Sequence, residues 1–268
     1  MLRGFYTAAS GMISQQRQQE ALANNIANAN TPGYKADQTT LRAFPEMLLQ
    51  QVGALNHVPT ENGLNIRQTN EVGPLNTGVY AQEMVPNHVQ GDMRETQIPT
   101  DVALMNGNMP DENGSLFFTV QNGAGDIRYT RNGNFTVDQE GFLVTNDGYY
   151  VLDSNGNQIN TDGVEFNVTQ NGVVQTVAGD FPLGISYVEN TDELVKEGTD
   201  LFAGEGVPVP GDVTFEVAQG FLERSNVDAG RTMTEMMEAY RVFEMNQRVL
   251  RAYDESMEKA VTEIGRIG

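Results

Sequence analysis

Residues 229–264 have the sequence AGRTMTEMMEAYRVFEMNQRVLRAYDESMEKAVTEI, in which apolar side chains recur three and four positions apart. This alternation is the heptad pattern of a coiled-coil helix, and it holds over about five heptads. A second stripe runs beside the first, so we expect this helix to have more than one neighbour. A helix packed only on its own domain would also explain one stripe. The first stripe comprises Ala229, Met233, Met236, Tyr240, Phe243, Gln247, Leu250, Asp254, Met257, Val261 and Ile264, and the second comprises Ala239, Val242, Asn246, Val249, Tyr253 and Ala260.

The other end of the chain has a matching pattern. Residues 2–30 predict a helix that Pro32 and Gly33 end. Its stripe is partly polar, so the isolated helix would be marginally stable and is expected to need partner helices. Two heptad helices at the two chain ends therefore favour a coiled coil built from both. The stripe comprises Leu2, Phe5, Ala9, Met12, Gln16, Gln19, Ala23 and Ile26.

The central part of the chain predicts β structure. Short apolar runs between residues 115 and 217 alternate with dipeptides that supply the positive φ of tight hairpin turns. Their density indicates a compact antiparallel domain. The dipeptides are Asn122-Gly123, Asn132-Gly133, Glu140-Gly141, Asp147-Gly148, Asn155-Gly156, Asp162-Gly163 and Asn171-Gly172.

The segment before the β region is harder to interpret. Residues 36–80 predict an irregular or extended connector, although LRAFPEMLLQQ, residues 41–51, is compatible with one or two helical turns around Pro45. The overall prediction is an α+β fold, in which the terminal N- and C-helices form a tube-forming coiled-coil domain around a central β-rich domain. The predicted segments are 1–35 (helical), 36–80 (connector), 81–220 (β-rich outer domain) and 221–268 (helical).

The charge is distributed unevenly. The chain has 16 basic and 36 acidic residues, a net charge of −20, and residues 36–221 carry almost all of the excess. Such an acidic surface argues against a nucleic-acid partner, because it cannot neutralise phosphates. The N-terminal residues lack the apolar stretch of a signal peptide, and no long uncharged apolar stretch predicts membrane insertion. We expect a protein that is cytosolic or exported without a cleaved signal.

The residues of common catalytic and metal sites are scarce. The chain has no cysteine and two histidines, His57 and His88, which lie far apart in polar sequence and are expected to be solvated loop residues. Nucleophile, phosphate-loop and dinucleotide motifs are absent. Residues 153–163, DSNGNQINTDG, have oxygen ligands at roughly calcium-loop spacing, but hairpin turns explain them better. The sequence therefore predicts no enzyme, no metal and no cofactor.

Three stretches resemble the flagellar basal-body rod and hook protein family. SGMISQQRQQEALANNIANANTPGYK, residues 10–35, is similar to its N-terminal signature, and GFLERSNVD, residues 220–228, is similar to its C-terminal motif. YTRNGNFTVDQEGFLVTNDGYYVL, residues 129–152, resembles the family's β domain. The resemblance is greatest to a distal-rod (rod–hook) protein. Residues 105–120 are longer and more polar than the Gly-rich turn usual in that type.

The resemblance implies a structural subunit of the basal body that polymerises helically. The terminal helices would enclose the export channel, and the assembly would transmit torque. The implied partners are further copies, other rod and hook proteins and the flagellar type III export apparatus. A secreted β-rich binding protein that forms a small closed oligomer is the alternative. The expected assembly interface comprises Leu2, Phe5, Ala9, Met12, Ala23, Asn24, Asn25, Ile26, Asn28, Met236, Tyr240, Phe243, Leu250, Met257, Val261 and Ile264.

Overall fold

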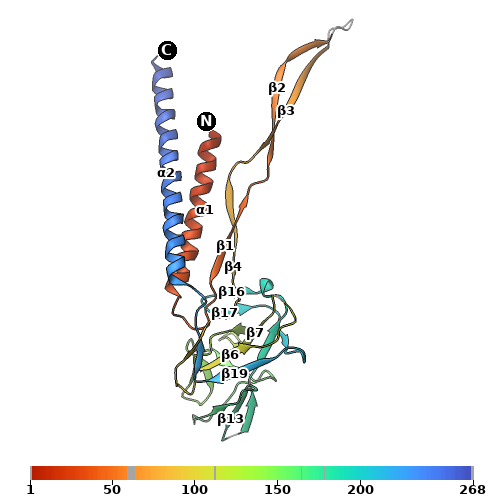
Figure 1. The fold of residues 1–268 in the computed structure, drawn as a ribbon, viewed down its shortest axis with the longest axis vertical. Coiled ribbons are helices and arrows are strands. Elements are labelled where there is room, and N and C mark those ends of the chain that lie inside the picture. Colours follow the sequence, from red (N-terminus) through yellow and green to blue (C-terminus); the bar gives the residue numbers. More distant parts are fainter. Residues whose placement is uncertain (1, 59–63, 112, 164, 178, 267–268) are drawn as a thin grey trace. The chain divides into compact units, whose positions relative to one another are not determined.

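The fold is taken from a computed structural model, which describes residues 2–58, 64–111, 113–163, 165–177 and 179–266. Two compact units are present, and each contains segments that are far apart in the sequence (Figure 1). The first unit comprises Met1–Ala21, Thr39–Met84 and Thr234–Gly268, and the second comprises Leu22–Gln38 and Val85–Met233. The predicted boundaries after residues 35, 80 and 220 stay predictions. The predicted α+β fold, with terminal helices flanking a β-rich centre, is confirmed.

Two long helices, α1 (Leu2–Ala27) and α2 (Ala229–Gly265), run through the first unit (Figure 1). Gly4 of α1 lies against the ring of Tyr253, and Gly11 lies against the amide of Asn246. These two pairs fix an antiparallel arrangement in which glycines let α2 side chains approach the α1 backbone. The carboxylate of Asp228 caps the start of α2 by accepting the amide of Gly230 at 2.9 Å. Neither helix, within the described residues, is both long enough and apolar enough to cross a bilayer.

A β ribbon accompanies the helices. β1 (Asp37–Ala43) pairs with β4 (Val79–Pro86), and β2 (Met47–Val58) pairs antiparallel with β3 (Leu64–Leu75). Helical turns at residues 41–51 were therefore the wrong alternative: Pro45 cannot lie inside a helix, and the partner strands satisfy the backbone instead. The Thr7 hydroxyl donates to the Thr77 carbonyl at 3.1 Å, which ties α1 to the ribbon.

The second unit is built from short strands around a nine-stranded sheet. The path through that sheet is β16-β17-β8-β7-β11-β10-β9, with β15 paired to β7 and to β18. A three-stranded sheet, β12-β13-β14, and the pairs β19-β6 and β20-β5 complete the unit, together with the short 3-10 helix Thr191–Glu193.

The strands are β5 (Met93–Glu95), β6 (Val102–Asn106), β7 (Ser115–Gln121), β8 (Ile127–Thr130), β9 (Phe135–Val137), β10 (Leu143–Thr145), β11 (Tyr150–Val151), β12 (Asn167–Val168), β13 (Val173–Thr176), β14 (Gly179–Pro182), β15 (Ile185–Val188), β16 (Val195–Glu197), β17 (Leu201–Ala203), β18 (Val207–Pro208), β19 (Phe215–Gln219) and β20 (Phe221–Glu223).

The predicted turn glycines mostly occupy the left-handed region. Five of the seven dipeptides have their glycine at positive φ: Gly141, Gly148, Gly156, Gly163 and Gly172. The two exceptions have physical reasons. In the turn that contains Asn122-Gly123, Gly125 has the positive φ instead of Gly123. In the second, Gly133 lies directly against the Val102 carbonyl, where no side chain fits.

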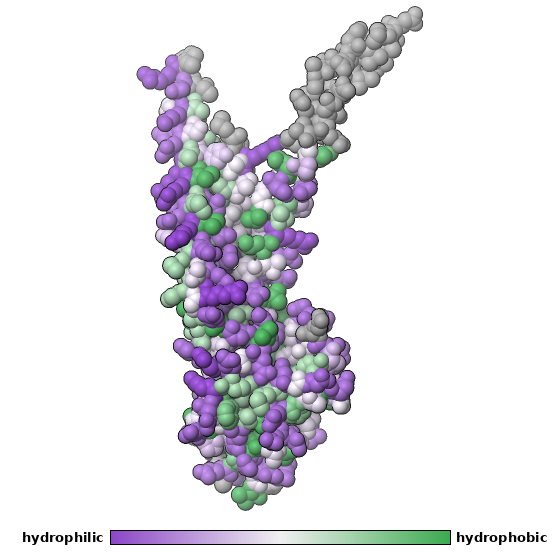
Figure 2. All heavy atoms as spheres, viewed as in Figure 1, coloured by the Kyte–Doolittle hydropathy of each residue, from purple (hydrophilic) through white to green (hydrophobic). Residues whose placement is uncertain are grey.

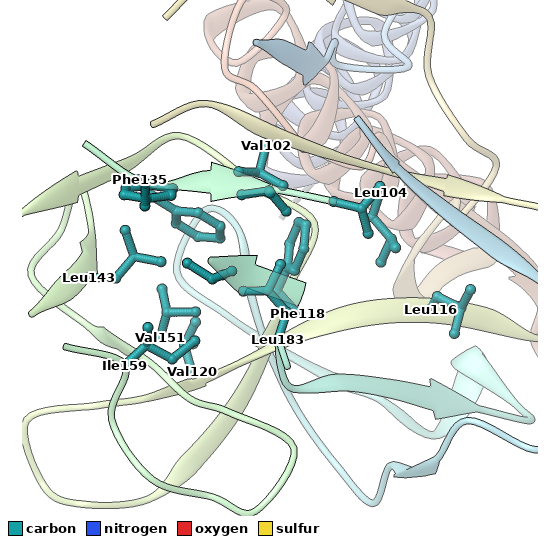
Figure 3. Close-up of a cluster of buried hydrophobic side chains, with 14 of the residues drawn as sticks. Val102, Leu104, Leu116, Phe118, Val120, Phe135, Leu143, Val151, Ile159 and Leu183 are labelled. Atoms are coloured by element: carbon teal, nitrogen blue, oxygen red, sulfur yellow. The ribbon is translucent and has the colours of Figure 1, made fainter. Parts of the chain in front are cut away.

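Strand β7 lies at the centre of the main hydrophobic core (Figure 3). Its side chains Leu116, Phe118 and Val120 are fully buried, and the Phe118 and Phe135 rings meet edge to face at 5.3 Å. The opposite side of β7 contributes Phe117 to a second cluster with Phe202. The two clusters lie on opposite sides of β7.

Candidate assembly surface and the buried polar junction

One face of α2 packs on α1. Asn246 and Tyr253 contact the α1 glycines, and Leu250 lies between them at heptad spacing and is half-buried. Ala239, two turns earlier, is 3% exposed. The seam within the chain therefore alternates between the two predicted stripes. Its members are Met236, Ala239, Phe243, Asn246, Leu250 and Tyr253, and Met257 and Ala260 continue the same line.

Most of the other stripe positions with described side chains are exposed, and they lie on either side of this seam. Tyr240 is 53% exposed and Val261 is 70% exposed. Figure 2 shows apolar side chains interspersed with charged ones on the surface of the helical region. Two exposed apolar lines can be defined on α2: the tyrosine line, Met233, Met237 and Tyr240, and the valine line, Val242, Met245 and Val249. Exposed apolar lines of this length are typical of interaction surfaces.

On α1 the predicted stripe lies beside the face that contacts α2. Ala8, one turn after Gly4, is buried, so the α2-facing side is rotated by one position from the predicted stripe. Phe5, Ala9, Met12 and Ile26 are half-buried, and Ala23 is exposed. Leu2 and Ile264 lie in the helices, but their side chains are outside the described residues.

The asparagines of the N-terminal motif have different roles. Asn25 is buried and bonds twice to the backbone of Asp37, donating to its carbonyl and accepting from its amide, both at 2.8 Å. Its carbonyl oxygen also accepts the Tyr34 hydroxyl at 3.0 Å. Asn28 donates to the Asn24 carbonyl at 2.9 Å and so closes the end of α1. Asn25 and Asn28 thus both bond to the backbone of their own chain.

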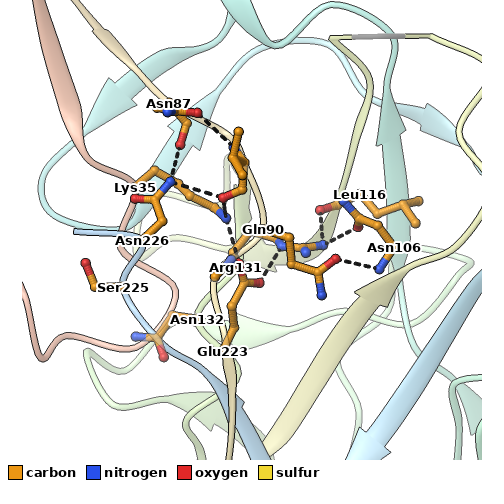
Figure 4. Close-up of polar contacts among 12 residues, drawn as sticks. Lys35, Asn87, Gln90, Asn106, Leu116, Arg131, Asn132, Glu223, Ser225 and Asn226 are labelled. Carbon is orange, nitrogen blue, oxygen red and sulfur yellow. Dashed lines mark hydrogen bonds and ion pairs between the residues drawn. The ribbon is translucent and has the colours of Figure 1, made fainter. Parts of the chain in front are cut away.

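A buried ion-pair network lies inside the second unit (Figure 4). Glu223 accepts from Lys35 Nζ at 2.6 Å with one oxygen and from Arg131 Nε at 2.9 Å with the other. All three side chains are at most 1% exposed. We call this set the buried triad. Removing one member of such a network leaves a buried charge without compensation.

The pKa values of the triad reflect both burial and pairing. Burial lowers the pKa of Lys35 to about 8, with Arg131 acting in the same direction and Glu223 opposing. Burial alone would raise the pKa of Glu223, but the adjacent Arg131 and Lys35 lower it overall. The carboxylate therefore stays charged at neutral pH and holds the two cations together.

A second ion pair lies beside the triad. Lys196 Nζ donates to both Asp37 carboxylate oxygens, at 2.9 and 3.0 Å, and lies 4.1 Å from the centre of the Tyr34 ring. Burial and the Asp37 charge raise the pKa of Tyr34. Asn226 accepts the Ala36 amide at 2.8 Å, so the residues after α1 and before α2 are fixed to each other.

His88 differs from its prediction. The solvated-loop interpretation was wrong, because its ring packs on Phe117 and Phe202 with centroid distances of 5.6 and 5.0 Å. The side chain of His57, in contrast, lies outside the described residues. The hairpin interpretation of residues 153–163 accounts for Asp153, whose Oδ1 accepts the amides of Asn155 and Asn157, both at 2.8 Å. In the described part of the chain, no three acidic, histidine or cysteine side chains are grouped to hold a metal.

Comparison with known proteins agrees with this arrangement. Three family models match: flagella basal body rod protein at residues 5–35, flagellar hook protein FlgE/F/G D1 domain at residues 113–176, and flagellar basal body rod FlgEFG protein C-terminal at residues 218–263. The flagellar hook-basal body complex protein FlhO of Bacillus subtilis is 42% identical, with all of both chains covered. The chain belongs to the flagellar basal-body rod and hook protein family. The basal-body rod protein FlgG of Agrobacterium fabrum is 35% identical, over 95% of this chain and 96% of its own. FlgG of Bacillus subtilis is 32% identical, over 97% of this chain and 98% of its own.

Membership makes this chain a structural component of the flagellar rod and hook, located in the basal body. The buried triad connects all three matched regions: Lys35 belongs to the first, Arg131 to the second and Glu223 to the third. The rod/hook motifs quoted from the sequence therefore meet in one buried site. The sequence indicated the motifs but not the pairing, because charged residues ordinarily predict solvent-exposed positions.

Proposed function

We propose that this rod-family chain polymerises helically through its terminal helices, encloses the export channel and transmits torque. Within that proposal its role is structural and not catalytic, and it needs no cofactor. It resembles a distal-rod subunit most, leaves the cell through the flagellar type III apparatus without a cleaved signal, and assembles with further copies and with other rod and hook proteins. Nucleic acid and direct membrane insertion have no part in it.

The observation that carries the proposal is the pair of exposed apolar lines on α2. They flank the seam that packs on α1, so neither line is used within the described chain. One further helix cannot cover both sides of α2 at once, and each copy therefore needs at least two neighbours. Contacts between different surfaces that do not close generate an open helical filament.

The apolar lines are large enough to drive association. Full burial of a Met, Val or Tyr side chain contributes about 1.5–3 kcal/mol. Each line has three such half-exposed side chains, so each of the two contacts would gain about 2–4 kcal/mol before the entropy of association is subtracted. A contact of this strength holds only when many copies act together, which suits a subunit that stays monomeric until it is incorporated.

The experiment introduces one charge into each line and compares both with a matched control. Tyr240→Glu and Met245→Glu change the tyrosine and valine lines, and Ser256→Glu adds the same charge at an exposed polar position of α2. Polymerisation of concentrated protein is followed by sedimentation and electron microscopy. Both line variants should stay unassembled while the control assembles like the wild type.

Two results would contradict the proposal. If both line variants polymerise like the wild type, the lines do not face neighbouring copies. If the wild type gives a discrete closed oligomer at every concentration, the alternative of a small β-rich binding oligomer replaces the filament.

A further inference from the structure

The segment Val85–Gly91, which we call the 85–91 segment, is held within the second unit by hydrogen bonds of its backbone groups. Side chains and backbone on both sides of the buried triad hold it at three positions (Figure 4). The bonds are Asn87 N to Ala36 O (2.8 Å), Asn226 Nδ2 to Asn87 O (2.7 Å), Lys35 Nζ to Val89 O (2.9 Å) and Gly91 N to Glu223 Oε1 (2.9 Å).

The only side chain of this segment that enters the second aromatic cluster is His88. Its ring meets Phe117 edge to face at 5.6 Å and lies 5.0 Å from Phe202, while these two phenylalanines lie 5.6 Å apart. Both ring nitrogens are buried, and neither finds a hydrogen-bond partner among the described residues. The site therefore favours the neutral imidazole over its charged form.

The charges around His88 oppose its protonation. Lys35 and Arg131 from the buried triad and Lys196 from β16 all act on the ring as positive charges. Their carboxylate partners, Glu223 and Asp37, are already bound to them. Two further carboxylates line a cavity together with His88: Asp111, which accepts the Tyr187 hydroxyl at 2.8 Å, and Asp192. A proton on His88 would thus add a fourth cation beside Lys35, Arg131 and Lys196, whose own carboxylate partners are already engaged.

We infer that His88 makes the 85–91 segment an acid-sensitive latch, in which protonation of the ring expels it from between Phe117 and Phe202 and frees the segment. Release would expose the two phenylalanines and one side of the buried triad. The latch stays closed at neutral pH, because burying the neutral ring between Phe117 and Phe202 costs far less than burying its protonated form. This inference is independent of how the chain assembles.

The expected dependence of latch opening on pH follows from the different pKa of His88 in the closed and open segment. Burial and the three cations lower the pKa of His88 to about 4, against 6.5 for an exposed histidine. The open segment therefore binds protons that the closed segment does not, and closure weakens as the pH falls from 6.5 toward 4. Between pH 7.5 and pH 5 the opening constant should rise about 30-fold.

The two histidines allow a direct test on the full chain. Proton NMR should show two imidazole titrations, and His88→Phe should remove the one with the low midpoint. Hydrogen exchange of the Asn87 and Gly91 amides, corrected for the intrinsic effect of pH, should reveal the 30-fold rise in the wild type. His57→Gln should retain that rise, and His88→Phe should lose it, since phenylalanine keeps the aromatic packing without a titrating group.

The inference is overturned if His88 titrates near 6.5 in the wild type, whatever the variants do. It is also overturned if His88→Phe shows the same pH response as the wild type at both amides. The titration of the wild-type chain decides the question even if His88→Phe fails to fold.

Discussion

Replacing Glu223 by glutamine should destabilise the second unit severely. The substitution keeps the size of the side chain but removes the carboxylate that contacts both Lys35 and Arg131. Two cations that are at most 1% exposed would then lie close together with no negative partner between them. Breaking a buried ion pair from one side costs about 3–5 kcal/mol.

The expected loss is large enough to measure by thermal unfolding. In a unit of this size, each kcal/mol shifts Tm by about 2–4 °C, so Glu223→Gln should lower Tm by about 10 °C. Circular dichroism at the β-sheet signal follows the transition. The matched control is Glu197→Gln, which breaks the partly exposed pair with Arg128. Exposed pairs contribute about 0–1 kcal/mol, so the control should unfold close to the wild type.

A double variant separates the lost charge from lost packing. Lys35→Met removes one of the two cations, and combined with Glu223→Gln it should cost less than the sum of the single changes, because the triad members interact directly. A Glu223→Gln variant that unfolds within 1–2 °C of Glu197→Gln would refute the reasoning, as would strict additivity with Lys35→Met.

Three further changes test other parts of the structure. Gly33→Ala should lower the free energy of unfolding by well over 1 kcal/mol, because Gly33 has a φ of 68° and a Cβ there would lie 2.5 Å from the Arg131 carbonyl carbon. The control is Gly148→Ala, at positive φ in open space, which should lower it by about 1 kcal/mol. Equal losses in chemical unfolding would contradict the close approach at Gly33. Tyr34→Phe should cost about 1–2 kcal/mol at pH 7 by removing the bonds to Asn25 and Asp37. Since the pKa of Tyr34 is raised in the folded state, its hydroxyl loses the proton first in the unfolded chain, and the wild type loses stability above pH 10. Tyr34→Phe should lose less stability in that range. Parallel curves of stability against pH for the two proteins would contradict this. Leu250→Asp should loosen α1 from α2, seen as faster hydrogen exchange at residues 5–20, while the transition of the β unit stays unchanged; unaltered exchange in α1 would show that Leu250 does not belong to the seam.

The sequence predicted the helices and the β region because their signals are local. Heptad spacing marks α1 and α2, and Asn-Gly or Asp-Gly pairs mark most of the turns. It could not decide which side of α2 meets α1, since both stripes have equal spacing. The decision rests on Gly4 and Gly11, whose missing side chains admit Tyr253 and Asn246. Absent side chains leave no periodic apolar signal.

The polar site was hidden for a different reason. Lys35 and Glu223 are 188 positions apart, and each looks like an ordinary surface charge in its own neighbourhood. Arg131 lies in a turn-rich stretch where a hairpin was the natural expectation. His88 likewise lies in the largely polar stretch PNHVQGD, residues 86–92, and nothing in that stretch predicts contact with Phe117 or Phe202. Only the tertiary arrangement makes these groups neighbours.

The separation between Lys35 and Glu223 also sets the timing of folding. A chain that is synthesised from its N-terminus has both cations of the triad long before their shared carboxylate. Until residue 223 arrives, closing the β unit would bury two positive charges unpaired, at a cost of several kcal/mol. A chain that lacks residue 223 is thus disfavoured from closing the β unit. The last strand, β20, supplies the missing carboxylate. We therefore expect the β unit to close only after residue 223 has been synthesised.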